Sequence, residues 1–437
     1  METTTEKAVS VWKNRNFLRL WTSDTISQFG TQFSGLAIPF TFILLSKNAF
    51  LFGLLQAVGG LAFPLFALFI GVYVDRHYRK RIMTLANVGR GLALGSVPLV
   101  AIAGFLSSLG ISLLFAVSFV VGLLTVFFDV SYQAILPSLV GRQQLVQGNS
   151  MLEFSRSSAA VVGPAMAGVV VQAVYPPLTL AIDASAYLAS AGVLSTIQTE
   201  EALQDSKKTV WHDLKEGLAV VLKDNRLRMI AGSTATFNLF GSALFPVAFL
   251  YLTGPLGLTA GVYGFIFTVG AVGLLVGVFL SGMIVRKIGL GWAIVASMLI
   301  GGLGLIPYVV VNPGLTSPAL AVLGPIPILG VLRIDRNVIL LMIAQFFVSL
   351  STVVYNINQV SLRQAIVPLR LQGRMNASMR WIVWGTIPLG ATIGGTLGTI
   401  VGLKPAMEIS VIGAIFAFLW VMFSPVRSLK VIPELRE

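Results

Sequence analysis

The sequence contains no cysteine and little charge, and each absence excludes a class of protein. Without Cys, neither disulfide bonds nor thiol chemistry can contribute. Only 11% of the 437 residues are charged whereas 56% are hydrophobic, so there are too few polar residues to cover a soluble globule. The two histidines, His77 and His212, lie outside the apolar segments, which argues against a histidine metal site or an intramembrane hydrolase.

Apolar segments long enough to cross a bilayer recur along almost the whole chain. A membrane helix needs about 20 apolar residues, and the mean hydropathy is +0.87. The sequence therefore predicts an all-α polytopic membrane protein with twelve transmembrane helices. We expect them at residues 17–45, 50–74, 82–103, 111–136, 150–174, 177–197, 229–252, 262–285, 292–311, 338–362, 376–401 and 405–423.

The basic residues indicate the orientation of these helices. The net charge is +13, but Lys and Arg lie at the ends of the apolar segments rather than in one basic domain, which argues against nucleic-acid binding. Few of them fall on the predicted outer side, and no signal peptide is evident before Asn16. By the positive-inside rule, both termini are predicted to be cytoplasmic.

Residues 198–228 form a hydrophilic linker between a first six-helix half, 1–197, and a second, 229–437. Apolar residues at helical spacing within the linker predict an amphipathic helix on the inner membrane face. Residues 312–337 are rich in Pro and Gly, so we expect an outer loop, and the sequence leaves open whether 318–332 enters the membrane.

The two halves repeat one another in sequence. Gln133-Ala-Ile-Leu-Pro137 has a counterpart in Gln364-Ala-Ile-Val-Pro368, and each is followed by an Asn-containing helix start, at 148–151 and 375–379. This similarity predicts two parallel six-helix repeats related by an axis along the membrane normal.

The segment GVYVDRHYRKR at 71–81 resembles the loop between helices 2 and 3 of the major facilitator superfamily. The resemblance implies a gating loop in which Asp75 faces the positive end of the helix beginning at Asn376. It also implies that Arg79 pairs with Asp129, closing the cytoplasmic side of an outward-facing state. Alternatively, the basic cluster only sets the topology. The residues matching this motif are Gly71, Asp75, Arg76, Arg79 and Arg81.

Two further stretches narrow the resemblance to one branch of the superfamily. Gly163, Pro164 and Gly168 resemble a shortened form of the helix 5 motif of antiporters, although a plain packing role fits equally well. The segments QAILPSLVGRQQLVQGNSM and VYNINQVSLRQAIVPLRLQGRMNASMRW are similar to the drug and siderophore exporters that include macrolide efflux proteins and the enterobactin exporter. One departure is Thr31, after Gly30, where that branch carries an acid.

Polar residues at helical spacing mark the first and fourth helices of each half, which line the central cavity in the superfamily. The alternative is that they hold helices together by hydrogen bonds of about 0.6 kcal/mol each. The candidate substrate-cavity residues are Gln28, Gln32, Phe33, Tyr132, Asn238, Tyr355, Asn356 and Gln359.

Three acids are candidates for proton coupling: Asp24, Asp129 and Glu153. A charge inside a membrane helix costs about 2.5–3.5 kcal/mol, so each needs a reason. Asp24 begins a polar stripe, but it equally suits a favourable position near a helix start. Glu153 and Arg156 are one turn apart and favour an ion pair with each other. For Asp183, a structural role is favoured.

We therefore predict a proton-coupled secondary efflux transporter of the plasma membrane that exports amphiphilic small molecules by alternating access. A nutrient importer or facilitator and a lipid flippase of the same fold are the alternatives. No enzymatic activity, nucleotide or other cofactor is implied, because no G-x-x-x-x-G-K-[ST] loop is present. A monomer suffices for this mechanism.

Overall fold

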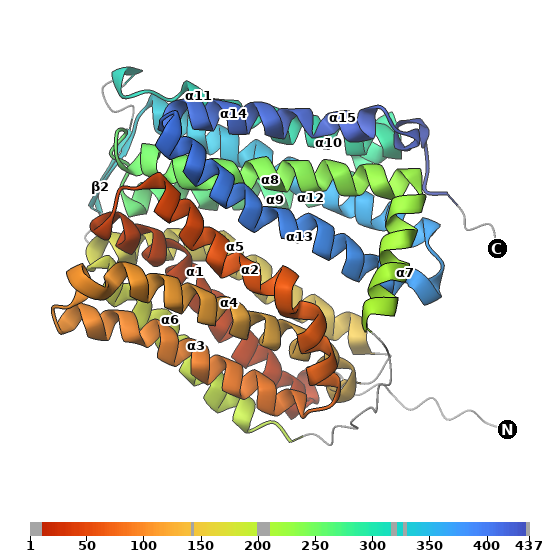
Figure 1. Cartoon of the computed structure of the whole chain (residues 1–437), viewed down its shortest axis with the longest axis horizontal. Coiled ribbons are helices and arrows are strands. Elements are labelled where there is room, and N and C mark those ends of the chain that lie inside the picture. The colour runs from red at the N-terminus through yellow and green to blue at the C-terminus, as the bar shows by residue number, and fades with distance from the viewer. Residues whose placement is uncertain (1–10, 141–143, 199–209, 316–320, 327–329, 434–437) are drawn as a thin grey trace.

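Long, roughly parallel helices form a bundle with two sides (Figure 1). The computed structural model describes residues 11–140, 144–198, 210–315, 321–326 and 330–433. The helices up to α6 lie on one side of the bundle and those from α8 onward on the other, and α7 crosses one end (Figure 1). We call this end the linker end and the opposite end, which carries two short strands, the hairpin end.

The first half of the described chain begins with a short 3-10 helix, η1 (Val11–Lys13), and continues in long helices. These are α1 (Arg15–Leu45), α2 (Ala49–Asp75), α3 (Arg79–Ile102), α4 (Leu106–Leu139), α5 (Leu145–Ala173) and α6 (Pro176–Ser195). The second half contains α8 (Asn225–Thr253), α9 (Ala260–Ile288), α10 (Leu290–Leu303), α11 (Ile306–Val310), α12 (Arg336–Ile366), α13 (Leu369–Ile400), α14 (Leu403–Phe416) and α15 (Phe418–Met422). Short 3-10 turns are η3 (Pro313–Leu315) and η4 (Pro425–Ser428).

Within the described residues, eleven helical segments are long and apolar enough to cross a membrane, which confirms the prediction of a helical polytopic protein. The 32-residue helix α13 is not among them. Its first turns carry Arg370, Arg374 and Arg380, and the rest of the helix is rich in Gly and Thr, so no part of it is apolar enough. It nevertheless packs lengthwise against α2 and α8 inside the bundle.

Side-chain caps explain several helix starts. Asn14 accepts hydrogen bonds from the backbone of Asn16 and Phe17 at the start of α1, and Asn48 caps α2 in the same way. Asp335 caps α12 by accepting from Val338 N. Each cap satisfies donors that the first helical turn leaves without a partner.

One predicted boundary is wrong in a way that affects the gating loop. α13 begins at Leu369, directly after Pro368, and not at Asn376. A residue that precedes Pro disfavours helical geometry, so Val367 interrupts the helix. α12 therefore ends at Ile366, and the new helix starts after Pro368. Asn376 therefore lies about two turns inside the helix, and the helix-end contact expected for Asp75 at Asn376 is not possible there.

The two halves pack with the same pattern of helix pairs. The contacts of α1 with α6 and of α3 with α6 have counterparts in α8 with α14 and α10 with α14. Between the halves, α2 packs against α13 and α5 packs against α9. This correspondence supports the predicted repeat. The division at residues 197 and 229 stays a prediction, since 199–209 lie outside the described residues.

Aromatic side chains close the bundle at the hairpin end. Phe40 of α1 lies 5.2 Å from Phe249 of α8 and 6.4 Å from Tyr263 of α9 between ring centroids. Phe52 of α2 also contacts Phe249, at 5.3 Å. All four rings are buried. Because each contact joins the two halves, this aromatic cluster separates the interior from the hairpin end.

Glycines let the halves approach closely at the same end. A Cβ at Gly53 of α2 would lie 2.9 Å from Gly395 Cα of α13. A Cβ at Gly168 of α5 would lie 2.5 Å from the Ala260 carbonyl oxygen of α9. Neither position has room for a side chain, so these contacts require Gly while this end is closed.

The segment rich in Pro and Gly before α12 differs in part from the predicted loop. Strands β1 (Ala321–Ile326) and β2 (Gly330–Ile334) pair antiparallel, with Ala321 opposite Ile334. This hairpin is short and irregular, because the register shifts between Leu323 and Ile326, next to Pro325. The sequence left open whether 318–332 enters the membrane, and residues 318–320 and 327–329 of that segment lie outside the described residues.

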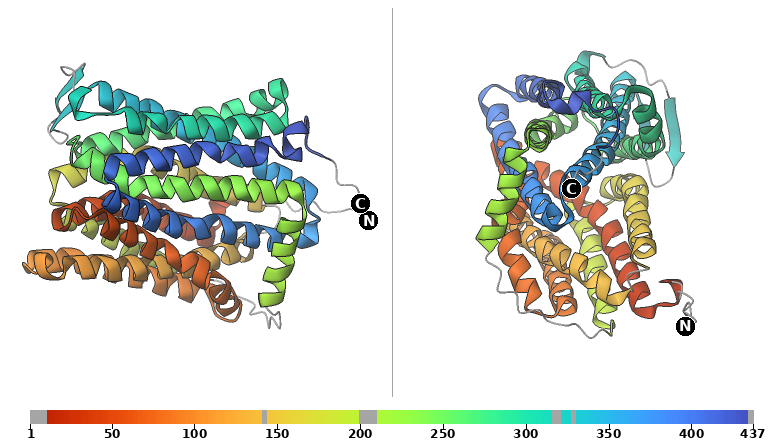
Figure 2. Two further views of the ribbon diagram at one scale, coloured as in Figure 1. Left: turned by 45° about the horizontal axis from the view of Figure 1, so that its top comes forward. Right: turned by 90° about the vertical axis from the view of Figure 1, so that its right-hand side faces the viewer.

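The predicted amphipathic linker helix is present as α7 (Val210–Lys223), but it packs on protein. Val221 and Leu214 are buried, while Glu216 forms an ion pair with Arg374 of α13. Gly217 lies against the backbone of Arg374 and the Ser378 hydroxyl. Figure 2 shows α7 lying across the helices at the linker end. The side chains of Trp211 and His212 are outside the described part.

Leucine in place of Gly217 is expected to detach α7 from α13. Its side chain would overlap the Arg374 carbonyl oxygen, and overpacking of this kind costs about 1–3 kcal/mol. We expect faster protease cleavage in the linker and a lower thermal unfolding temperature of the detergent-solubilised protein. Gly373→Leu is the matched control, because nothing lies within 4 Å of a Cβ at Gly373. Equal behaviour of the two variants would contradict the docking.

Candidate functional site

A cavity of about 760 Å³ lies among the helices of the first half, with α13 closing one side. α1 and α4 contribute most of its polar lining, and α5 contributes residues near the linker end. Its ionisable lining residues are Asp24, Arg90, Asp129, Tyr132, Glu153, Arg156, Tyr187 and Arg380. A cavity with this many charges at the depth of membrane helices can hold water, ions or a polar ligand.

Asp24 is the most buried of the cavity carboxylates, with 2% of its surface exposed. Its Oδ1 accepts a hydrogen bond from Gln28 Nε2 at 3.3 Å, and its Oδ2 accepts one from the Tyr132 hydroxyl at 3.5 Å. Both partners are neutral. The geometry brings together three residues that the sequence singles out, Asp24, Gln28 and Tyr132, at one wall of the cavity.

Asp129 of α4 lines the same cavity, and its side chain is exposed to it. The charged groups that act on it are the guanidinium groups of Arg90, Arg156 and Arg380. These cations come from three helices, α3, α5 and α13. The pairing with Arg79 is expected only in a state closed at the linker end, and this conformation does not test it.

Arg90 is a buried cation held between two aromatic rings. Its guanidinium carbon lies 4.5 Å from the ring centroid of Phe128 and 4.2 Å from that of Tyr187. It donates hydrogen bonds to Asn87 Oδ1 and Thr125 Oγ1. The ring faces stabilise the charge by cation–π interactions, which are strong where water is excluded.

The carboxylates of Glu153 and Asp183 have surroundings that differ from those of Asp24 and Asp129. Glu153 and Arg156 form the predicted ion pair at 3.8 Å, and the side chains of both are more than half exposed, so the pair contributes little stability. Asp183 is fully buried in the middle of α6. Its Oδ1 lies 2.7 Å from where a Cβ at Gly30 would be, and it is not part of the cavity wall.

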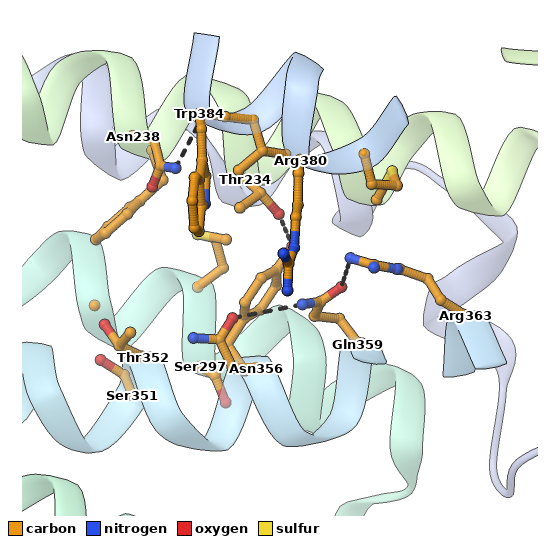
Figure 3. A pocket seen from close by; sticks show the side chains of 16 residues that line it. Thr234, Asn238, Ser297, Ser351, Thr352, Asn356, Gln359, Arg363, Arg380 and Trp384 are labelled. Atoms are coloured by element: carbon orange, nitrogen blue, oxygen red, sulfur yellow. Dashed lines mark hydrogen bonds between the residues drawn. The ribbon is translucent and has the colours of Figure 1, made fainter. Parts of the chain in front are cut away.

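A second cavity, of about 270 Å³, lies in the other half between α8, α10, α12 and α13 (Figure 3). The Thr234 and Tyr355 hydroxyl groups are 2.8 Å apart across it, and Gln359 Nε2 donates to Asn356 Oδ1 at 3.4 Å. Asn238 Nδ2 donates to the Val383 carbonyl oxygen at 3.2 Å. Four predicted cavity residues, Asn238, Tyr355, Asn356 and Gln359, thus line one site.

The cavities adjoin one another around α13. Arg380 and Trp384 line both of those described above, and Trp384 also lines a third cavity of about 420 Å³. The third cavity shares Thr31, Ser34 and Asp129 with the first. The combined space lies on the linker-end side of the aromatic cluster, and it reaches the exposed side chains of Glu153 and Arg156.

Two predicted cavity residues of α1 lie elsewhere. Phe33 is buried in the apolar core, and Gln32 packs against Gly163 of α5, where a Cβ would meet the Gln32 side chain. Neither lines the described cavities. The reason is that Gly163 leaves room for Gln32 between the helices. In the same motif, Pro164 and Gly168 contact α9.

The residues of the predicted gating loop lie at the linker end. α2 ends at Asp75 and α3 begins at Arg79, while nothing lies within 4 Å of a Cβ at Gly71. Arg76 and Arg81 are exposed. Tyr78, the residue before α3, has an extended backbone with φ −61°, so the turn does not require Gly at this position.

Several lining residues were missed by the sequence reasoning. Arg363 falls one residue beyond the predicted end of its helix, but α12 continues to Ile366 and places it in the second cavity. Arg380 and Trp384 lie on the fifth helix of their half, which carries no polar stripe of the kind used for prediction. A search for charges within one turn of each predicted helix end would have found Arg363.

Comparisons with known proteins agree with this architecture. A family profile described as Major Facilitator Superfamily matches residues 20–332. Macrolide efflux protein A of Streptococcus pyogenes is 26% identical over 242 residues, which are 54% of this chain and 59% of that protein. The protein of the same name from Enterococcus faecalis is 29% identical over 199 residues, 44% of this chain and 61% of that protein. The chain therefore spans about three-fifths of the length of these relatives.

Solved structures show the same fold at low identity. A bacterial homologue of the iron transporter ferroportin in an inward-facing state aligns with a TM-score of 0.70 at 16% identity, covering 93% of this chain and 98% of that one. The corresponding outward-facing structure aligns over the same shares with a TM-score of 0.58 at 16% identity. The likeness extends over nearly the whole chain.

Proposed function

Because the chain belongs to the Major Facilitator Superfamily, we propose that it is a secondary active transporter that exports amphiphilic small molecules in exchange for protons. The observation that carries the proposal is the combined space of the adjoining cavities, which is lined by α1 and α4 of the first half and by α8, α12 and α13 of the second. The aromatic cluster closes this space at the hairpin end. Counting α13 with the eleven candidate spans gives a transporter of twelve membrane helices.

We assign the linker end to the cytoplasm, with both termini on that side, and the membrane to the plasma membrane. The supporting observation is the clustering of basic residues at this end, including the loop at 76–81 and the start of α13. In this orientation the structure is an inward-facing state. The closer likeness to the inward-facing relative than to its outward-facing form supports the same assignment.

The lining favours an amphiphilic cargo. Phe237 and Trp384 offer apolar faces within reach of Gln359, Asn356 and Thr234, and aromatic faces tolerate varied shapes. The similarity to macrolide efflux proteins supports outward transport of a compound of this kind. Proton exchange would use the buried carboxylate of Asp24 or the cavity-facing carboxylate of Asp129, each of which lies within the lining.

The proposal is tested by transport in proteoliposomes. We expect amphiphilic dyes to move against their gradient when a pH gradient is imposed, and to stop when a protonophore dissipates it. Empty liposomes are the control. If the dye equilibrates across the membrane without a pH gradient, the result would indicate facilitated diffusion instead of proton exchange. Movement of labelled lipid without dye transport would favour a flippase. Accumulation in the inward direction would indicate an importer.

A further inference from the structure

The smaller cavity contains two cations and no acid. Arg363 of α12 and Arg380 of α13 both line it, and among the described residues of its wall none is Asp or Glu. Figure 3 shows both guanidinium groups pointing toward Gln359. Positive charge deep in a membrane protein is costly unless it is paired or functional, so the composition of this wall points to a ligand of opposite charge.

Arg363 is oriented by neutral groups only. Its Nη1 donates to Gln359 Oε1 at 3.0 Å, and its Nη2 donates to Asn376 Oδ1 at 2.6 Å. Its Nε is buried without a hydrogen-bond partner among the described residues. Amide oxygens fix the plane of a guanidinium group but do not neutralise it. The side chain is thus held in place with its charge uncompensated.

Arg380 is free to bind a ligand. It is exposed to the cavity, its guanidinium carbon lies 5.6 Å from the Trp384 ring centroid, and it makes no hydrogen bond or ion pair within the described chain. Its electrostatic neighbours include Asp129 in the larger cavity and the like charge of Arg363. Two cations facing one space repel each other unless an anion lies between them.

We propose that the smaller cavity is the subsite for an oxyanion group of the transported amphiphile, a carboxylate, sulfonate or phosphate, bound by Arg363 and Arg380. Guanidinium groups bind oxyanions through pairs of hydrogen bonds, which gives both affinity and orientation. Trp384 and Phe237, in the same wall, would contact the apolar part of the cargo. This inference rests on the proposed transport function and narrows its substrate to amphiphiles that carry a negative group.

The test compares a rhodamine dye that has a free carboxylate with the ethyl ester of the same dye. Binding to the purified full-length protein in detergent is followed by fluorescence anisotropy. Because charge-assisted pairs of this kind discriminate strongly, we expect the wild type to bind the acid about tenfold more tightly than the ester. Arg363→Gln and Arg380→Gln should each weaken binding of the acid about fivefold or more and leave the ester within about twofold.

The controls separate charge from folding. Arg370→Gln removes an exposed arginine of α13 outside the cavities and should retain the preference for the acid. Arg363→Lys and Arg380→Lys keep the positive charge and should retain part of the preference for the acid. All variants are compared by size-exclusion profile, so that a misfolded protein is recognised. Competition by an aryl phosphate and by lysophosphatidic acid then distinguishes a soluble oxyanion from a lipid headgroup.

The outcomes keep the two proposals apart. Equal affinity of the wild type for acid and ester, or equal losses for both dyes in the glutamine variants, would overturn the oxyanion subsite and leave the exporter intact if both dyes are transported. Failure of the wild type to bind or transport either dye would count against the proposed function itself. Selective loss of binding of the acid dye in both glutamine variants supports the oxyanion subsite.

Discussion

Leucine at Gly264 is expected to open the hairpin end and to slow transport at least tenfold. Gly264 of α9 lies against the Pro164 carbonyl oxygen and 3.1 Å from Gly168 Cα of α5, measured from where its Cβ would be. A side chain there cannot fit while the two halves are closed. Overpacking costs about 1–3 kcal/mol, and each 1.4 kcal/mol changes an equilibrium about tenfold, so the closed state should lose most of its population.

Because the chain has no cysteine, opening of the hairpin end can be measured with a single introduced thiol. A single reporter, Val247→Cys, introduces a thiol at a fully buried position of α8. In the Gly264→Leu background, a membrane-impermeant maleimide should label it at least tenfold faster, and gradient-driven efflux should fall by a similar factor because the inward-facing state is no longer reached.

Two further variants define what the result means. Gly264→Ala should give an intermediate labelling rate, since its side chain is smaller. Gly192→Leu is the control, because a Cβ at Gly192 has nothing within 4 Å, and it should behave as the parent does. Unchanged labelling together with normal transport in Gly264→Leu would show that the α5–α9 contact does not form in the transport cycle.

The helices could be predicted from the sequence because hydropathy and helix-stop signals coincide at most of their ends. α1 was expected at 17–45 and is found at Arg15–Leu45, and α8 was expected at 229–252 and is found at Asn225–Thr253. The misplaced ends are those where a helix continues beyond its apolar part. α13 begins in an arginine-rich segment, and hydropathy reports the apolar part of a helix rather than all of it.

The site could be predicted only where one helix supplies the whole signal. The stripe of Asp24 and Gln28 faces the cavity as its spacing predicts. Gln32 continues that stripe in sequence, but the neighbouring α5 has Gly163 at the point of contact and accepts the side chain. Whether a polar residue lines a cavity or packs against another helix depends on the neighbouring helix. The spacing of residues within one helix does not show which residues of the neighbour it contacts.

The same limit explains the basic wall of the smaller cavity. Arg363 and Arg380 are 17 positions apart on two helices, and Pro368 turns the chain between them. Neither residue belongs to a motif whose spacing implies a shared site. Their proximity follows from the packing of α12 and α13 around α8 and α10, which is a tertiary property.

Asparagine at position 24 is expected to uncouple efflux from the pH gradient. Asp24 Oδ1 and Oδ2 accept hydrogen bonds from Gln28 and Tyr132 at 3.3 and 3.5 Å, and asparagine is close to aspartate in size. The change therefore keeps the side chain in place and removes only the ability to exchange a proton. We expect gradient-driven dye efflux to fall roughly 5–150-fold, the usual range for coupling between two sites.

Dye binding without a gradient should stay within about twofold of the wild type, because neutral Asn and protonated Asp present similar surfaces to the cavity. Glu408→Gln is the matched control, since Glu408 is an exposed carboxylate of α14 outside the described cavities. Loss of dye binding in Asp24→Asn would instead assign Asp24 to the substrate.

Parallel variants decide between the three acids. If efflux remains gradient-driven in Asp24→Asn and is lost in Asp129→Asn, the proton site is the cavity-facing carboxylate among Arg90, Arg156 and Arg380. Glu153→Gln should have the smallest effect, because Glu153 is mostly exposed and already paired with Arg156. A buried carboxylate with neutral partners can gain and lose a proton as access alternates without breaking an ion pair, and Asp24 meets that requirement more closely than the other two.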